Sequence, residues 1–343
     1  MNILLSSVEQ KTYMIQYFKY ALNGSGKVFA SNSVMTYSLT QTDGFLITPQ
    51  TYDNSYVNAL TGFCQANEIK YIIPLSDMDL LILAKNKEKL QDNDIFVVVS
   101  GESAIEICND KWQTYLFLSS LGLPQPKTYI NLESARQEIK SGRLNFPLFI
   151  KPRWGTEYMG VVQVDTMNEL NVFYQRILHD MFQSYLRDIS QKNKSESIII
   201  QEKVEGDEYS LDILHDLKGN YITAIAKQKL AMRGSETDIA QVTDNKPFEN
   251  TLKIISSNLQ SVAAIDADCF ITKSGDVVVL EINGRIGNQY SFAHLAGVNF
   301  PKQIIEWLKG APTSADYISA ELGIKGCKEW PLPVCFNFSQ IEK

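Results

Sequence analysis

The first hundred residues alternate short apolar segments with helical ones, and this alternation restricts the fold more than any other feature. Asn2–Leu5 is expected to form a strand, and apolar residues from Tyr13 to Leu22 then recur at helical spacing. Strands that alternate with helices predict a parallel, doubly wound sheet. Further strands are expected at Lys27–Ala30, Gly44–Ile47, Tyr71–Pro74 and Ile95–Val99, and helices at Tyr52–Asn67 and Asp77–Lys89.

The second half of the chain has a different order of elements. Helices are expected to begin at Asp110 and to cover Met167–Arg187, and the polar segment Asp188–Ser197 is expected to be a solvated loop. Strand-like runs with few helices between them then predict an antiparallel α+β fold. These runs are Ile198–Lys203, Tyr209–His215, Tyr221–Lys227, Asp268–Thr272 and Asp276–Ile282, with one helix expected at Phe248–Ile265.

The length of 343 residues is too great for one simple core and suits two or three packed domains. A boundary is expected near Gly101–Ile107, so that residues 1–105 form the parallel-sheet domain and residues 106–310 a second domain. Residues 311–343 contain three prolines and little periodicity, and they are expected to form an irregular tail.

Composition and charge exclude several classes of function. The net charge of −7 argues against a nucleic-acid partner, because proteins that bind phosphate backbones usually carry a basic stripe. No apolar run approaches the ~20 residues that a membrane span needs. The five cysteines include no CxxC pair and the three histidines have no spaced partner, so we expect reduced thiols in a cytoplasmic protein without a zinc site or a histidine-led mechanism.

Two nucleotide-binding motifs are absent from the first half of the sequence. A dinucleotide fold needs G-x-G-x-x-G after its first strand, but Ser6-Ser7-Val8-Glu9 stands there. Gly24–Lys27 looks like the end of a P-loop, yet it precedes a strand instead of opening a helix. We therefore expect a surface turn at Gly24–Lys27.

An apolar run near the end of the chain, in Val277–Ser291, stops on polar residues. Strand side chains alternate between faces, so Glu281 and Asn283 point to one side while Ile282 points to the core. The alternative is a set of strand-end residues solvated at a sheet edge. An acid, an amide and an arginine (Arg285) after a fully apolar run favour a functional site.

A hairpin turn at 273–275 would bring the preceding strand alongside, so Asp266 and Asp268 come within reach of Glu281. Carboxylate and amide oxygens without His or Cys suit Mg²⁺, which keeps several waters and takes its other ligands from substrate phosphates. Arg285, just beyond, is placed to contact the same phosphates bidentately. The sequence therefore predicts a magnesium–phosphate site.

Three further segments fit such a site. Lys151 ends an apolar strand, which is costly unless an anion meets it. Lys111 begins a helix beside Asp110, although a solvated helix residue explains it equally well when taken alone. Gln201–Glu208 passes from an apolar strand into alternating charges and is placed to supply backbone groups to a nucleobase, although by itself it is an ordinary strand and turn.

Four motifs, in order, resemble those of the ATP-grasp superfamily, and most of all its carbamoyl-phosphate-synthase-like members. They are Asp110-Lys111, KPRWG at Lys151–Gly155, QEKVEGDEYS at Gln201–Ser210 and LEINGR at Leu280–Arg285. With MNILLSS at the start and the run at 72–84, the resemblance covers nearly the whole chain to about Trp307. It implies a pre-ATP-grasp domain followed by a two-subdomain ATP-grasp fold, with a small lid subdomain at about 123–205.

The resemblance also implies roles for individual residues. ATP would be bound by Lys111 and Lys151 at the phosphates, by Glu202, Lys203 and Val204 at the adenine, and by Glu208 at the ribose. One or two Mg²⁺ ions, or Mn²⁺ in their place, would be bound by Asp268, Glu281 and Asn283. Arg285 would steady the γ-phosphate or an acyl phosphate, with Lys229 and Arg233 near the reacting carboxylate.

Two positions depart from the family pattern. Glu157, Tyr158 and Met159 fill a loop that is usually rich in glycine and serine, where a carboxylate would repel phosphates. Gly284 stands where the family commonly has proline, which loosens the turn without removing a ligand. The loop casts doubt on turnover more than on nucleotide binding.

The implied activity is an ATP-dependent carboxylate–amine ligase that acts through an acyl phosphate. The sequence does not identify the carboxylate or the amine substrate. Four residues are equally expected to line the substrate pocket or to be structural: Arg233, Glu236, Asn288 and Tyr290. Two alternatives stay open: a nucleotide-binding protein without ligase turnover, and a dinucleotide-dependent oxidoreductase, which the missing glycine fingerprint disfavours. No segment identifies a dimer interface, so a homodimer also stays open.

Overall fold

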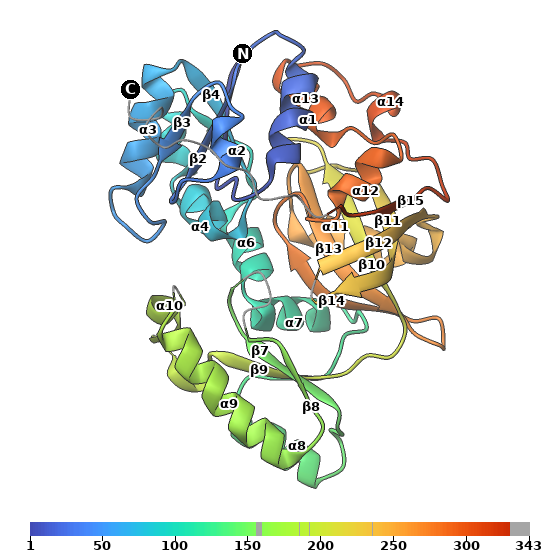
Figure 1. The fold of residues 1–343 in the computed structure, drawn as a ribbon. Helices are drawn as coiled ribbons and strands as arrows, with labels where there is room; N and C mark the ends of the chain where they lie inside the picture. The colour runs from blue at the N-terminus through green and yellow to red at the C-terminus, as the bar shows by residue number, and fades with distance from the viewer. Residues whose placement is uncertain (156–159, 185, 192, 235, 330–343) are drawn as a thin grey trace.

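Three β-sheets organise the chain, and their arrangement confirms the predicted fold class. The computed structural model describes residues 1–155, 160–184, 186–191, 193–234 and 236–329. Figure 1 shows a parallel sheet at the N-terminus, a large antiparallel sheet beside it, and a smaller sheet that projects away from both.

The N-terminal domain is built on a five-stranded parallel sheet in the order β3-β2-β1-β4-β5. Ile3 and Leu5 of β1 pack against α1, whereas Leu4 packs on the opposite face against α3 and α4, as strand alternation requires. Helices therefore cover both faces. The elements are β1 (Asn2–Ser6), α1 (Thr12–Leu22), β2 (Val28–Asn32), α2 (Tyr37–Thr40), β3 (Phe45–Ile47), α3 (Tyr56–Ala66), β4 (Ile69–Pro74), α4 (Asp77–Lys85), α5 (Lys87–Gln91) and β5 (Phe96–Val97).

The small sheet, which we call the lid (residues 128–202), has the order β6-β9-β7-β8 with antiparallel neighbours. Leu148, Ile150 and Ile200 pack with α8 and α9 in a core of their own. Helices α6 (Glu102–Asn109) and α7 (Lys111–Ser120) connect the N-terminal domain to the lid. The lid elements are β6 (Thr128–Tyr129), α8 (Leu132–Lys140), β7 (Leu148–Pro152), β8 (Val162–Val164), α9 (Met167–Phe182), α10 (Arg187–Gln191), η1 (Lys194–Glu196) and β9 (Ile198–Glu202).

The largest sheet, which we call the body sheet, is six-stranded and antiparallel in the order β14-β13-β10-β11-β12-β15. One face packs on α11, and the other packs partly on α1, α12 and α13. Its elements are β10 (Asp207–His215), β11 (Tyr221–Arg233), β12 (Glu236–Thr243), η2 (Lys246–Phe248), α11 (Glu249–Leu259), β13 (Ala264–Ile271), β14 (Val277–Asn283), α12 (Tyr290–Leu295), α13 (Phe300–Leu308), α14 (Ala315–Ile318) and β15 (Lys325–Cys327).

Several predicted bounds were wrong. The helix expected at Phe248–Ile265 ends at Leu259, because Gln260 adopts a left-handed conformation and strand β13 begins at Ala264. The helix expected at Met167–Arg187 ends at Phe182. The segment expected to be a solvated loop, 188–197, instead contains most of α10 and all of η1. The helix expected at Asp77–Lys89 is divided at Asn86.

The expectation of an irregular tail was also wrong for its first part. Residues 315–318 form α14, and β15 extends the body sheet by pairing Cys327 with Ile239 of β12. Strand β12 itself was not predicted. The tail beyond residue 329 lies outside the described residues, and the domain boundaries stay a prediction.

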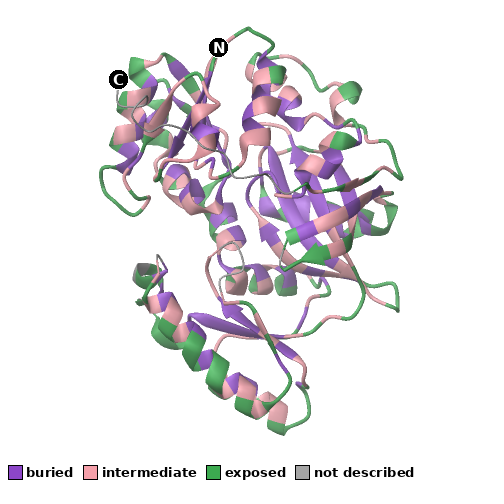
Figure 2. Cartoon of the chain, viewed as in Figure 1, coloured by how far each residue is buried: buried purple, intermediate pink, exposed green. Residues whose placement is uncertain are grey.

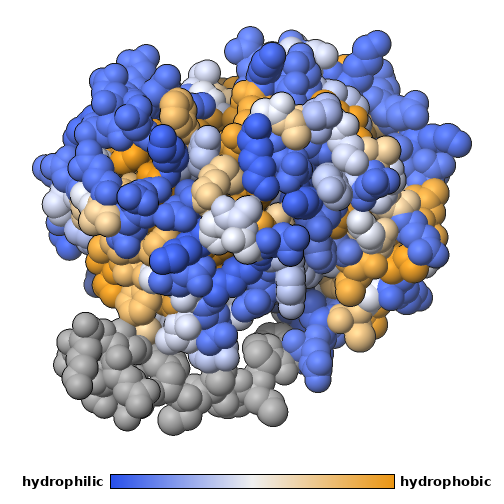
Figure 3. Space-filling view, turned by 90° about the horizontal axis from the view of Figure 1, so that it is seen from above, coloured by the Kyte–Doolittle hydropathy of each residue, from blue (hydrophilic) through white to orange (hydrophobic). Residues whose placement is uncertain are grey.

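Helix length and surface hydropathy bear on membrane contact and on partners. No helix in the described ranges combines the length and the apolar character that a bilayer crossing requires. Figure 2 shows buried residues along the strands of both large sheets and exposed residues along one side of α9. The face seen in Figure 3 is largely hydrophilic with small hydrophobic groups, and it does not identify a dimer interface.

Candidate active site

Strands β13 and β14 bring acidic and amide side chains together on one face of the body sheet. Asp268 pairs with Glu281 and Asp266 with Asn283, which confirms the predicted hairpin pairing. The register shifts between Asp268 and Cys269, because Leu280 forms a bulge in β14. Bulges often lie beside functional sites, where they redirect a side chain. Here the bulge sets Glu281 opposite Asp268.

Asp266 is buried and fixed from three sides. Its Oδ1 accepts a hydrogen bond from Ser210 Oγ at 2.7 Å, and its Oδ2 accepts one from Asn283 Nδ2 at 3.3 Å. A Cβ added to Gly287 would lie 2.6 Å from Asp266 Cγ, so the backbone after β14 packs directly on this carboxylate. Asp266 therefore orients Asn283, whose Oδ1 remains available as an acceptor.

Lys229 joins two of the predicted site carboxylates. Its Nζ lies 2.7 Å from Glu208 Oε1 and 2.8 Å from Asp268 Oδ1, and its side chain is 2% exposed. Burial opposes the charge on Lys229, but the two carboxylates outweigh it and raise the Lys229 pKa. Burial raises the pKa of Asp268 to about 7, against the opposing charge of Lys229. The cluster thus holds more acidic groups than one lysine neutralises.

Glu281 faces several cations without contacting any of them. Its carboxylate makes no hydrogen bond or ion pair with another described residue. Burial alone would raise the Glu281 pKa, but the charges of Lys111, Lys151 and Lys229 lower it. Glu281 is therefore an ionised carboxylate near three lysines, and its oxygens have no polar partner among the described residues.

Lys151 is a buried cation with no polar partner among the described residues. The residue is 6% exposed, and within the described part of the chain its ammonium makes no hydrogen bond or ion pair. Burial lowers the Lys151 pKa to about 8, with Glu281 opposing the shift and Lys111 adding to it. A buried ammonium is costly without an anion. Lys111 Nζ donates to the Gly155 carbonyl oxygen at 2.9 Å.

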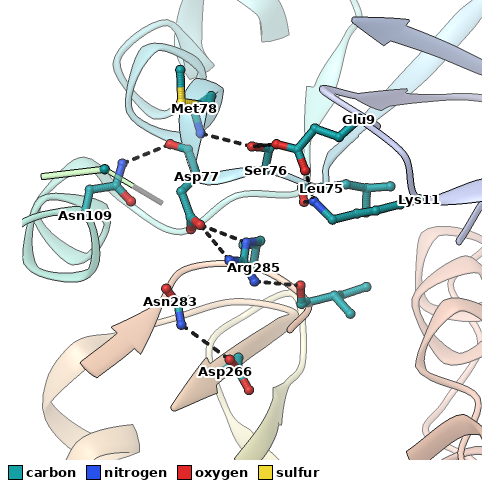
Figure 4. Close-up of polar contacts among 12 residues, drawn as sticks. Glu9, Lys11, Leu75, Ser76, Asp77, Met78, Asn109, Asp266, Asn283 and Arg285 are labelled. Carbon is teal, nitrogen blue, oxygen red and sulfur yellow. Dashed lines mark hydrogen bonds and ion pairs between the residues drawn. The ribbon is translucent and has the colours of Figure 1, made fainter. Parts of the chain in front are cut away.

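Arg285 reaches across to the N-terminal domain. Figure 4 shows its guanidinium against Asp77 at the start of α4, with Nη2 and Nε at 2.7 and 3.0 Å from Asp77 Oδ2. Both side chains are nine-tenths buried. Burial opposes the charge on Arg285, but Asp77 raises the Arg285 pKa. The Asp77 contact joins residues that are 208 positions apart.

The other predicted site residues are placed as follows. Glu202 Oε1 accepts a hydrogen bond from Lys127 N at 2.8 Å, and Lys203 Nζ lies 3.5 Å from Glu205 Oε1. Arg233 Nη2 pairs with Asp238 Oδ2 on the surface at 2.9 Å. Val204 follows β9.

Three residues proposed to line the substrate pocket also have described surroundings. Glu236 lies 3.2 Å from Lys328 Nζ. The Tyr290 hydroxyl accepts from Phe300 N at 2.8 Å and donates to the Val298 carbonyl oxygen at 3.2 Å, so it holds the local fold together. Asn288 has a buried Oδ1 without a hydrogen-bond donor. Glu157–Met159 lie outside the described residues.

Sequence reasoning missed a second buried ion pair and the partner of Arg285. Lys227 pairs with Asp212 on the same face as Lys229, and both side chains are almost fully buried. Charged residues at alternate positions of a strand, 227 and 229, are the signal that was available. No local signal connected Asp77 with Arg285, because the contact depends on how two domains meet.

The residue types on this face suit a divalent cation with oxygen ligands. Asp268, Glu281 and Asn283 converge from neighbouring strands, and Glu281 has free carboxylate oxygens. Across the residues that the structure describes, no three His, Cys, Asp or Glu side chains form a metal-binding group by themselves. A cation here would therefore take its remaining ligands from water or phosphate, which is the behaviour of Mg²⁺.

Comparisons with known proteins agree with this geometry. The chain is 21% identical to the carbamoyl-phosphate synthase of Methanobrevibacter smithii, over 84% of this chain and 76% of that protein. It is 26% identical to the D-alanine–D-alanine ligase of Neisseria gonorrhoeae, over 62% of this chain and 70% of that protein. Its fold matches biotin carboxylase of Campylobacter jejuni, solved as a β,γ-ATP complex, with a TM-score of 0.73, 15% identity and coverage of 94% and 74%.

Two family models match separate parts of the sequence. Residues 3–98 match the PylC-like N-terminal domain, which corresponds to the parallel sheet. Residues 144–292 match the ATP-grasp domain and span most of the lid and of the body sheet through β14. The chain therefore carries a region similar to the ATP-grasp domain, preceded by a region similar to the PylC-like N-terminal domain.

Proposed function

We propose that the protein is an ATP-dependent ligase that joins a carboxylate to an amine. One observation carries the proposal: Lys151 is buried with no hydrogen bond or ion pair to a described residue, and the nearby Glu281 is ionised and likewise unpaired among those residues. A triphosphate with its divalent cation supplies the charges that both groups lack. The similarity to carbamoyl-phosphate synthase and D-alanine–D-alanine ligase supports the class of reaction.

The nucleotide binds between the lid and the body sheet in this proposal. Lys111 and Lys151 bind its phosphates, and the adenine lies against the strand end at Glu202, Lys203 and Val204. Glu208 holds the ribose. Glu208 is paired with Lys229, so the carboxylate proposed to hold the ribose is already oriented by this lysine.

Asp268, Glu281 and Asn283 hold one or two Mg²⁺ ions, for which Mn²⁺ can substitute. The cation supplies positive charge beside the phosphates, where phosphoryl transfer depends on positioning and charge neutralisation more than on covalent catalysis. This dependence explains how the site works without a histidine.

The reaction has two steps. A carboxylate oxygen of the first substrate attacks the γ-phosphorus of ATP, the bond to the β,γ-bridging oxygen breaks, and ADP leaves with that electron pair. The amine nitrogen of the second substrate then attacks the acyl carbon, inorganic phosphate leaves, and the amine loses a proton. Arg285 steadies the transferred phosphoryl group, held in place by Asp77. Lys229 and Arg233 stand near the reacting carboxylate.

The experiment is a screen of carboxylate and amine pairs for phosphate release with MgATP, with Glu281→Ala as the matched negative. We expect at least one pair to release phosphate and ADP with the wild-type protein and none with the variant. Binding of MgATP without ADP release across a broad panel would favour the alternative of a nucleotide-binding protein without turnover. Equal turnover by Glu281→Ala would overturn the assignment of the site.

A further inference from the structure

The lid is joined to the rest of the chain through very few polar side chains. It has its own hydrophobic core, and in Figure 1 it projects from the remainder of the molecule beyond α7. Within the described part of the chain, and apart from contacts to the adjoining residues 126–127 and 203–205, the side-chain hydrogen bonds and ion pairs that connect the lid to other segments run from Asp110 or Lys111 to Arg153 or Gly155. These contacts therefore determine how the lid sits on α7.

The Arg153–Asp110 pair is well ordered by its surroundings. Arg153 Nε lies 2.7 Å from Asp110 Oδ1, and Nη2 lies 2.7 Å from Oδ2, so the two groups meet bidentately. Their side chains are 11% and 12% exposed. The guanidinium also lies 4.5 Å from the ring centre of Trp154, which fixes its plane.

Asp110 has a second task at the start of α7. Its Oδ1 accepts a hydrogen bond from Trp112 N at 3.0 Å, which caps the helix whose first residue is Lys111. Lys111 N in turn donates to the Arg153 carbonyl oxygen at 3.2 Å. One carboxylate thus orients both the helix that carries Lys111 and the lid segment that follows Lys151.

The two lysines repel one another. Lys111 is close enough to lower the Lys151 pKa, although the two residues come from α7 and from β7. This repulsion favours separation of α7 from β7 until an anion binds. The Asp110–Arg153 pair lies next to both lysines in sequence and opposes the separation.

We infer that Asp110 and Arg153 are positioning residues, which hold Lys111 and Lys151 as a preformed pair for the nucleotide phosphates. The inference rests on the proposed function, because it assumes that ATP is the ligand of the two lysines. Neither Asp110 nor Arg153 touches the nucleotide in this account. Their loss weakens recognition of the phosphates and leaves recognition of adenosine unchanged.

The test compares the affinities of ATP and adenosine by isothermal titration calorimetry. The variants are Arg153→Met and Asp110→Asn, with Arg143→Met as the matched control. Arg143 also meets a carboxylate bidentately, with Nε and Nη2 each 2.7 Å from oxygens of Glu138, but this pair lies within the lid and contacts neither Asp110 nor Lys111 in the described structure. Circular dichroism confirms that each variant is folded before titration.

We expect Arg153→Met to weaken ATP binding about tenfold or more while adenosine affinity and the Arg143→Met control stay at the wild-type level. The Arg153→Met/Asp110→Asn double variant is expected to lose little more than either single variant, because both remove one interaction. Unchanged ATP affinity in Arg153→Met, or equal losses for ATP and adenosine, would overturn the inference. A wild-type protein that does not bind ATP would instead overturn the proposed function.

Discussion

The two faces of the body sheet are built from the same strands and differ in almost every property. On the face toward α11, Leu211, Ile265 and Val279 pack in an apolar core. On the opposite face, the alternate positions carry Ser210, Asp212, Lys227, Lys229, Asp266, Asp268, Glu281 and Asn283. The face toward α11 packs as an apolar core, whereas the opposite face gathers charge beside a part that packs on α1, α12 and α13.

This difference shows which face is maintained for function. Buried ion pairs such as Lys227–Asp212 are costly to desolvate, and apolar residues of similar size often stabilise a fold as well or better. Stability alone therefore does not account for the polar face. If the comparison is right, substitutions on the polar face should change activity, and substitutions on the face toward α11 should change the free energy of unfolding.

The largest expected effect is on the polar face. We expect Glu281→Gln to reduce ADP release by about 10³-fold, because the charged ligand of the Mg²⁺ that neutralises the reacting phosphate is lost while its shape is kept. The melting temperature should change little, since Glu281 makes no hydrogen bond or ion pair with another described residue. Full ADP release by this variant would break the comparison.

Ile282, the next residue along β14, faces the apolar core and is fully buried. Replacing it with alanine should lower the free energy of unfolding by about 3 kcal/mol through lost burial and a cavity. Chemical denaturation measures this loss, and ATP affinity below the transition should match the wild type. A variant that keeps its stability but loses ATP binding would contradict the division between faces.

Lys151 connects the polar face to the lid. Lys151→Met should weaken ATP binding about 30-fold, because a charge-assisted contact to phosphate is lost. Burial sets the Lys151 pKa at about 8, and a phosphate partner would raise it, so ATP binding at pH above 8 should take up a proton. Calorimetry in buffers with different ionisation enthalpies measures this uptake. Uptake that persists in Lys151→Met would assign the proton to another group.

The smallest expected effect concerns a polar residue that serves the fold. His215 is fully buried beside Ser261, and burial lowers its pKa to about 4. The His215 imidazole therefore binds a proton more readily in the unfolded chain than in the folded protein. The folded state thus keeps its full stability from this group above about pH 6.5, and it loses that stability as the pH falls toward 4.

Between pH 7 and 5 this loss should amount to about 1 to 2 kcal/mol. His215→Asn should show a weaker pH dependence of stability over that range, whereas the exposed control His179→Gln should follow the wild type. Denaturation at several pH values measures both. If the free energy of unfolding depends on pH identically in the wild type and in His215→Asn, the pH dependence does not come from His215.

The fold could be predicted from the sequence to a large extent because its patterns are local. Alternation of strand and helix indicated the parallel sheet, and a tight turn at 273–275 was enough to pair Asp268 with Glu281. The bulge at Leu280 was not predicted, since a run of four apolar residues does not show which one leaves the ladder. Strand β12 was missed because its sequence, ETDIAQVT, is polar on average.

The candidate site could be predicted less completely, because its contacts join distant segments. Alternate charges marked the site carboxylates, and an apolar strand ending on Lys151 marked a buried cation. The pairing of Arg285 with Asp77, and of Arg153 with Asp110, depends on how domains meet in space. Such partners have no signal in spacing or periodicity.

The central claim is that the polar face of the body sheet binds a nucleotide together with a divalent cation. It is tested most directly by titrating a non-hydrolysable ATP analogue into the wild-type protein and Glu281→Gln at increasing Mg²⁺ concentrations. We predict that Mg²⁺ strengthens binding to the wild type and has little effect on binding to the variant. Equal dependence on Mg²⁺ in the two proteins, or none in the wild type, would contradict the claim.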